Sequence, residues 1–149
     1  QKLEFTASMY HDKQQGPVIP AKCLRKMLIE GGRKSKDGKR FEAGCFVSDN
    51  APLEYEGPRD IEGMYNAETA DGEKTFAWST VVKNQSSSII RTRPRFDTWS
   101  CDFDLAYEDS VLDMEKITNS LNKGEYQTGI CDGRSLGMGR FTAEVLSEA

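Results

Sequence analysis

The sequence concentrates positively charged side chains in one stretch, although the chain as a whole carries a formal net charge of −4. The stretch RKSKDGKR, residues 33–40, holds five cations: Arg33, Lys34, Lys36, Lys39 and Arg40. Lysine and arginine gathered in this way are typical of surfaces that neutralise nucleic-acid phosphates. The ordinary alternative is a solvated loop, in which the same charges only face water.

Two further groups of arginines accompany this stretch. Arg91, Arg93 and Arg95 alternate along RTRPRF, and the glycine-rich segment GICDGRSLGMGRF, residues 129–141, contains Arg134 and Arg140. Four glycines of that segment permit a backbone with positive φ, which could bring N–H groups close to phosphate oxygens; they are Gly129, Gly133, Gly137 and Gly139. The alternative is a plain connection with glycines at its turns. Acidic residues gather instead in 54–73 and 102–115, so the two signs of charge are segregated.

Aromatic side chains accompany the second arginine group and could stack on bases. They are Phe76, Trp78, Phe96 and Trp99. For each ring the alternative is packing in the core, and we favour core packing for Trp99.

Groups suited to catalysis or metal binding are sparse. His11 is the only histidine, and although Asp12 follows it, neighbouring side chains in a strand or loop usually point apart. Asp102 and Asp104 lack a third oxygen-rich ligand, and the four cysteines never form a C-x-x-C pair, which argues against a zinc site. We expect reduced thiols, as is usual for a cytosolic protein. The sequence therefore predicts no catalytic residue, no metal site and no cofactor.

The elements that must position these residues follow from periodicity and turn residues. Residues 1–9 alternate as a half-buried strand does, a helix begins near Pro20 and stops at Gly31-Gly32, and 43–49 is a short buried strand. The basic stretch then lies in the connection between that helix and that strand. Residues 50–72 show no periodicity and are expected to be irregular.

The second half of the chain predicts a hairpin over 74–96, with the turn NQSS between its strands and Pro94 favouring an edge position. A strand over 99–107 alternates most clearly, and a helix follows, capped by Asp109 or Ser110 and ending at Gly124. Its expected apolar stripe is Val111, Met114, Thr118 and Leu121, and a last strand covers 137–146. The predicted fold is one α+β domain over 1–149 with a ferredoxin-like βαββαβ order, interrupted by an insertion at 50–96.

Two motifs at matching places in this order carry a family resemblance. GPVIPAKCLRKMLIEGG, residues 16–32, resembles the segment that leads into the first helix of the RAMP superfamily, the RNA-binding subunits of CRISPR effector complexes. Residues 129–141 resemble the C-terminal glycine-rich loop of that superfamily. Together with RTRPRFDTWS, residues 91–100, the two motifs also look like small phage proteins. Ala21, Lys22 and Cys23 depart from its usual Gly-Ser-Ser. The resemblance implies RNA binding and a hairpin that covers the nucleic acid, a part for which residues 74–96 are the candidate.

Together these features predict a protein that binds single-stranded RNA or DNA by contacts to the backbone of the nucleic acid. We expect repeated protomers along the strand and a phage or CRISPR-like system. The expected location is the cytoplasm of a bacterial host, since no segment resembles a secretory signal or approaches the roughly 20 apolar residues of a membrane span. A protein–protein interaction module, such as a phage inhibitor or assembly component, is the alternative. An RNA-cleaving enzyme is the third possibility.

Overall fold

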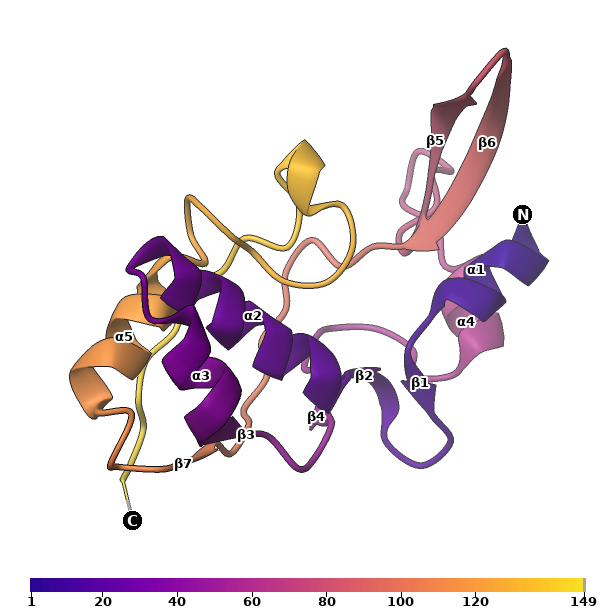
Figure 1. The fold of residues 1–149 in the computed structure, drawn as a ribbon. Helices are drawn as coiled ribbons and strands as arrows, with labels where there is room; N and C mark the ends of the chain where they lie inside the picture. The colour runs from indigo at the N-terminus through magenta and orange to yellow at the C-terminus, as the bar shows by residue number, and fades with distance from the viewer. Residues whose placement is uncertain (149) are drawn as a thin grey trace. The chain divides into compact units, whose positions relative to one another are not determined.

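The computed structural model describes residues 1–148, apart from the side chain of Asn84. The described chain is mixed α+β, with five α-helices, one 3₁₀ turn and small antiparallel sheets (Figure 1). It forms two compact units. The first consists of Gln1–Val18 and Pro52–Asp102, and the second consists of Ile19–Ala51 and the chain from Phe103 onward. The insertion predicted at 50–96 lies almost wholly within the first unit.

The second unit is built around α2 (Ala21–Lys34), against which α3 (Gly38–Gly44) and α5 (Met114–Asn122) both pack. Two short strands, β3 (Cys45–Phe46) and β7 (Ala106–Tyr107), pair antiparallel, with Cys45 opposite Tyr107. The 3₁₀ turn η1 (Arg134–Leu136) lies in the glycine-rich segment. Buried side chains of this unit include Leu24, Met27, Leu28, Phe41, Leu112, Ile117 and Leu121.

The helix predicted after Pro20 is confirmed, but its predicted stop at Gly31-Gly32 is wrong. A Cβ at Gly31 would lie 2.4 Å from the backbone oxygen of Ser120 in α5, and a Cβ at Gly32 would lie 2.3 Å from the Phe41 ring in α3. The two glycines therefore let two helices approach α2 closely, and helix packing outweighs their poor helix propensity. Because α2 continues to Lys34 and α3 begins at Gly38, the basic stretch is a helix–helix turn and not a helix–strand connection.

In the first unit, α1 (Lys2–Ser8) replaces the strand predicted for residues 1–9. Phe5 is fully buried while Leu3 is 84% exposed, so the alternation of apolar residues reflects one anchor and not a sheet face. The hydroxyl groups of Thr6 and Ser8 donate to the carbonyls of Lys2 and Glu4, as is common for these residues in helices. The core of this unit is Phe5, Met64 and Phe76, surrounded by further aromatic and aliphatic side chains.

The remaining elements of this region are short. β1 (His11–Asp12) pairs antiparallel with β2 (Gly16–Ile19), and β4 (Ala51–Pro52) completes a three-stranded sheet of order β1-β2-β4. The helix α4 (Ile61–Asn66) interrupts the segment 50–72 that was expected to be irregular, and the Asp60 side chain caps it.

The predicted hairpin is confirmed as β5 (Ala77–Asn84) and β6 (Ser87–Pro94), with Gln85 and Ser86 in the turn. Figure 1 shows its outer half extending away from α1 and α4. The pair forms a two-stranded sheet of its own, in agreement with the edge position expected for Pro94.

Three other predictions need correction. Residues 101–107 do alternate between half-buried and exposed, but only Ala106–Tyr107 form a strand there. The second predicted helix begins later, with Asp113 as its cap, and buries Ile117, Ser120 and Leu121. Residues 139–148 contain no strand, because Phe141 alone packs, against Gly124, while Ala143 and Val145 face solvent without a neighbouring strand.

Candidate nucleic-acid interface

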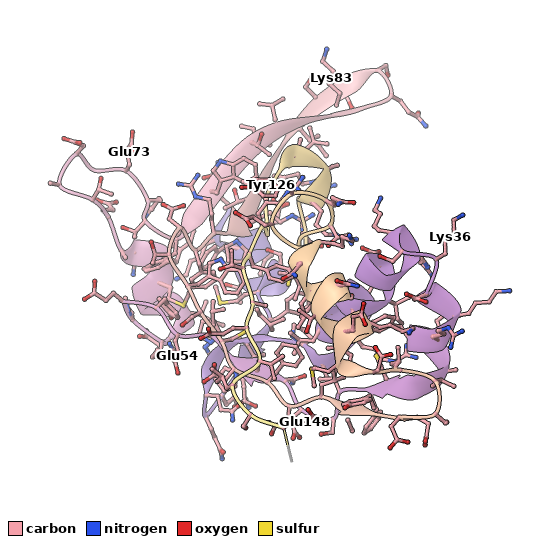
Figure 2. All side chains as sticks on the ribbon, turned by 90° about the vertical axis from the view of Figure 1, so that its left-hand side faces the viewer. Lys36, Glu54, Glu73, Lys83, Tyr126 and Glu148 are labelled. Atoms are coloured by element: carbon pink, nitrogen blue, oxygen red, sulfur yellow. The ribbon has the colours of Figure 1, made fainter. Side chains whose placement is uncertain are left out.

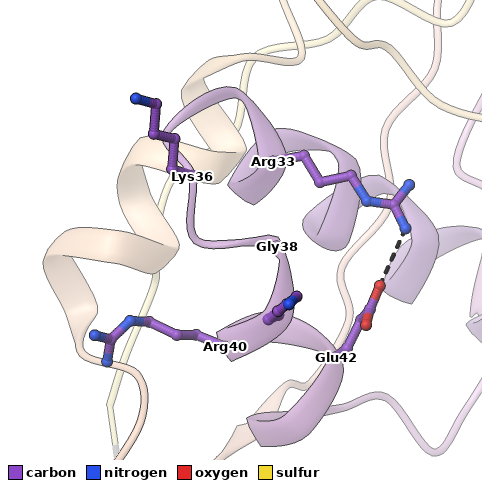
Figure 3. Close-up of a pocket in the computed structure, with 6 residues that line it drawn as sticks. Arg33, Lys36, Gly38, Arg40 and Glu42 are labelled. Carbon is purple, nitrogen blue, oxygen red and sulfur yellow. Dashed lines mark hydrogen bonds and ion pairs between the residues drawn. The ribbon is translucent and has the colours of Figure 1, made fainter.

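The turn from α2 to α3 gathers the five cations of the basic stretch, and we call residues 33–42 the elbow. Arg33, Lys34, Lys36, Lys39 and Arg40 are all exposed. A shallow concavity of about 470 Å³ lies in the elbow and is lined by Arg33, Lys36, Gly38, Lys39, Arg40 and Glu42 (Figure 3). Four of those six residues are cationic, so the concavity attracts anions.

The arginines and lysines of the elbow differ in what they contact. Arg33 Nη2 lies 3.1 Å from Glu42 Oε1, and Arg40 Nε lies 3.6 Å from Asp37 Oδ1. In contrast, the ammonium groups of Lys34, Lys36 and Lys39 have no ion-pair or hydrogen-bond partner within the described chain. Figure 3 shows Arg33 turned toward Glu42 and Lys36 pointing away from both. The lysines are thus the groups available to an external anion.

Arg25 of α2 connects the two helices that flank the elbow. Its Nη2 donates to the carbonyl of Glu42 at 2.8 Å, and its Nε donates to the carbonyl of Cys45 at 3.2 Å. These bonds attach the C-terminal end of α3 to the N-terminal half of α2. Phe41 packed over Gly32 adds a second contact between the two helices that flank the turn.

The hairpin in the first unit forms a second basic surface. Trp78 lies opposite Arg93 and Thr80 lies opposite Arg91, and since opposed residues share a face, Trp78, Arg91 and Arg93 lie on one side of the ribbon. Trp78 and Arg93 are half-buried, while Arg91 is exposed and has its Nη1 3.5 Å from Glu4 Oε1 in α1. Arg95 lies beyond β6, with its Nε 3.0 Å from Asp97 Oδ1.

Two aromatic rings proposed for base stacking are parts of the core. Phe76 is 6% exposed, and Phe96 packs against both Phe76 and Tyr55, with ring centroids 5.7 and 4.8 Å apart. These two rings therefore pack in the core, which was the alternative to base stacking for each aromatic residue. Trp99 is half-buried, and Trp78 is the ring that accompanies the hairpin arginines.

The glycine-rich segment adopts the backbone that its sequence predicts. Gly129, Gly133, Gly137 and Gly139 all have positive φ, between 69° and 82°. A Cβ at Gly139 would lie 1.9 Å from the carbonyl oxygen of Ile130, whose own N–H donates to the Gly139 carbonyl at 2.9 Å. The glycines therefore allow the segment to fold tightly upon itself.

This tight folding uses up donors that a phosphate would need. The N–H groups of Leu136 and Met138 donate to Gly133, and the N–H of Gly137 donates to Arg134. The Arg134 guanidinium pairs with Glu30 of α2. Arg140 is exposed, with no partner for its guanidinium in residues 1–148. Of the cations predicted here, Arg140 is free to bind and Arg134 ties the segment to α2.

The residues considered for catalysis have structural partners. His11 Nε2 lies 2.8 Å from the carbonyl oxygen of Arg59. Asp12 accepts hydrogen bonds from the N–H groups of Gln15 and Gln14, and these bonds lower the pKa of its carboxyl group. Asp102 and Asp104 are exposed, and the described residues contain no group of three His, Cys, Asp or Glu side chains that could hold a metal ion.

The predicted binding residues thus fall into three groups on two units: the elbow and the glycine-rich segment in the second, and the hairpin in the first. The sequence interpretation omitted Lys83, which is exposed and extends from the outer end of the hairpin (Figure 2). Because Lys83 directly precedes the NQSS turn, the sequence places it at the tip of the predicted hairpin, close to the other basic residues of that hairpin. No helix among the described residues is long and apolar enough to cross a bilayer.

The comparisons with known proteins return nothing that assigns the chain to a family. No family model, no curated protein and no solved structure matches it.

Proposed function

We propose that this protein binds single-stranded nucleic acid through its phosphate backbone. The observation that supports this most directly is the elbow, where Lys34, Lys36 and Lys39 are exposed and unpaired within the described chain. In a chain of net charge −4, cations that fold stability does not use are available for an anionic partner. A phosphate backbone presents such charges at regular spacing, which suits several separate lysines better than one small anion does.

The hairpin surface supports the same function with different chemistry. Trp78 is half-buried and lies on the same face as Arg91 and Arg93, so a base that stacks on its ring would have its phosphates near the guanidinium groups. Base stacking of this kind contributes about 1–3 kcal/mol per base and shows little sequence preference. Each surface could act by itself, and the proposal does not require them to be adjacent.

Several finer predictions belong to this proposal. The RAMP resemblance, the ferredoxin-like arrangement and the phage or CRISPR-like setting remain predictions from residues 16–32 and 129–141 and from the order of elements. Assembly of repeated protomers along the strand also remains a prediction, and mass photometry with a long single strand tests it. The absence of catalysis is a prediction too, which is tested by whether a labelled strand remains intact with added divalent cations.

The direct test is a salt titration of strand binding, followed by fluorescence anisotropy. If about four cations contact phosphates, log affinity against log salt has a slope near −3, at roughly −0.7 per contact. The ratio of absorbance at 260 and 280 nm of freshly purified protein is a simple companion measurement, because single-strand binders often retain nucleic acid. Absence of binding at low salt, for both DNA and RNA strands, would refute the proposal.

A second candidate function has its own supporting observation. Val81 and Ile90 oppose each other on the outer half of the hairpin, on the face opposite to Trp78, and are 63% and 57% exposed. Exposed apolar side chains on a projecting ribbon are typical of protein–protein contacts. A protein interaction module would show no strand affinity and would instead be recovered with a partner protein, and this outcome separates the two candidates.

A further inference from the structure

The backbone of the elbow contains a conformation that glycine would adopt more easily. Lys36 has φ of +64°, in the left-handed region, and directly follows Ser35, the C-cap of α2. Its N–H donates to the Arg33 carbonyl at 3.1 Å, and the N–H of Asp37 donates to the Gly32 carbonyl at 2.8 Å. This pair of bonds is the Schellman motif, whose left-handed position is usually glycine because a Cβ is disfavoured there.

The side chain of Lys36 makes no ion pair or hydrogen bond that would stabilise the described fold. Its ammonium group has no partner in the described chain, and it lines the concavity of the elbow together with Lys39. A residue kept in an unfavourable conformation without an internal contact points to a use outside the fold. The left-handed turn gives Lys36 a direction that a helical residue at the end of α2 would not have.

The other lining residues indicate what kind of ligand fits. Arg33 and Arg40 are engaged by Glu42 and Asp37, so they form charged walls, while Lys36 and Lys39 supply the unpaired charge. The lining contains no aromatic or aliphatic residue on which a base could stack. A volume of about 470 Å³ exceeds the need of one phosphate and leaves room for adjoining sugars.

From these observations we infer that the elbow is a clamp for the phosphodiester backbone of the strand. Lys36 and Lys39 contact the phosphates, Arg33 and Arg40 shape the walls, and the bases lie outside the concavity. This inference rests on the proposed function and assigns it to particular side chains. It also implies that binding at the elbow does not depend on base identity, because phosphate contacts position a strand without reading its sequence.

The test compares single lysine substitutions. A fluorescently labelled strand of twenty thymidines is titrated at several salt concentrations with the wild type and with Lys36→Gln, Lys39→Gln and Lys26→Gln. Lys26 is the matched control, because it is exposed on α2 and unpaired within the described chain, but it lies outside the elbow and does not line the concavity. Lys36→Gln and Lys39→Gln should each flatten the slope of log affinity against log salt by about 0.7, while Lys26→Gln keeps the wild-type slope.

Lys36→Gly adds a second readout that separates binding from folding. Glycine relieves the left-handed backbone, so the melting temperature should not fall and should rise by up to about 4 °C. Affinity for the strand should nevertheless fall as it does in Lys36→Gln. A Lys36→Gly protein that binds like the wild type would overturn the inference.

The remaining outcomes separate this inference from the function on which it rests. If the wild type binds no strand at low salt, both are refuted. If it binds, but all three glutamine variants share its slope, the elbow inference fails while the hairpin surface can still support the function. If poly-glutamate of matched charge binds more tightly than the strand and loses affinity in the same variants, the elbow is a site for an acidic protein partner and the inference is overturned.

Discussion

Substitution of Gly31 by alanine tests the packing that holds the elbow-bearing helix. A Cβ at this position would lie 2.4 Å from both the backbone oxygen and the Oγ of Ser120, and that Oγ donates to the buried carbonyl of Leu28 at 2.6 Å. Overpacking of this kind costs about 1–3 kcal/mol, and disturbing the buried hydrogen bond costs about 1 kcal/mol more. Alanine's better helix propensity offsets about 1 kcal/mol.

The net expectation for Gly31→Ala is a loss of about 1–3 kcal/mol in the free energy of unfolding, or about 2–10 °C in melting temperature. Circular dichroism on heating measures this, with Lys26→Ala on the exposed face of α2 as a control that changes no packing. Adding Ser120→Ala should not rescue the variant, because the backbone oxygen remains. A Gly31→Ala protein about 1 kcal/mol more stable than the wild type, as propensity alone predicts, would refute the close α2–α5 contact.

Three further predictions address the hairpin and the capped helix. Replacing Arg91 and Arg93 together by glutamine should flatten the salt slope by about one unit and weaken all strand sequences alike, whereas an unchanged slope removes the hairpin from the binding surface. Gln85→Gly should raise stability toward urea by about 0.5–1 kcal/mol, because Gln85 has φ of +54° in the turn, and a loss would show that its side chain makes a stabilising contact. The N–H of Lys116 lowers the pKa of Asp113, so this carboxylate stabilises the fold above its ordinary pKa of about 4 and less as pH falls through the lowered value. Asp113→Asn should therefore lose less stability between pH 6 and pH 3 than the wild type, and equal losses would contradict the assignment.

The parts of the fold that the sequence predicts well are those defined by local signals. The hairpin combines β-branched residues with a polar turn, and the helix after Pro20 has an apolar face that α3 and α5 cover. The strands predicted at the two ends of the chain are wrong, because a period of two over a few residues does not show whether a neighbouring strand exists. The helix stop predicted at Gly31-Gly32 is wrong for a related reason, since the role of these glycines depends on Phe41 and Ser120, which no local pattern connects to them.

The candidate site shows the same division between local and long-range information. The charge of residues 33–40 is visible in the sequence, and so are the positive φ angles of the glycine-rich segment. Which cations are already paired is not visible, because Arg134 is neutralised by Glu30, which lies 104 residues away. The left-handed Lys36 was equally hidden, because no glycine or asparagine marks that position in the sequence.

The pairing of charges changes where the binding energy should come from. A cation already held by a carboxylate must exchange one partner for another when a phosphate arrives, so its net contribution to affinity is small. Arg134, Arg33 and Arg40 should therefore contribute less to affinity than Lys36 and Lys39, which only exchange water for phosphate. Counterion release follows the number of phosphates contacted and not the number of basic residues. The measured slope should therefore count the cations that contact phosphates, Lys36 and Lys39 of the elbow among them, and not the five charges of the basic stretch.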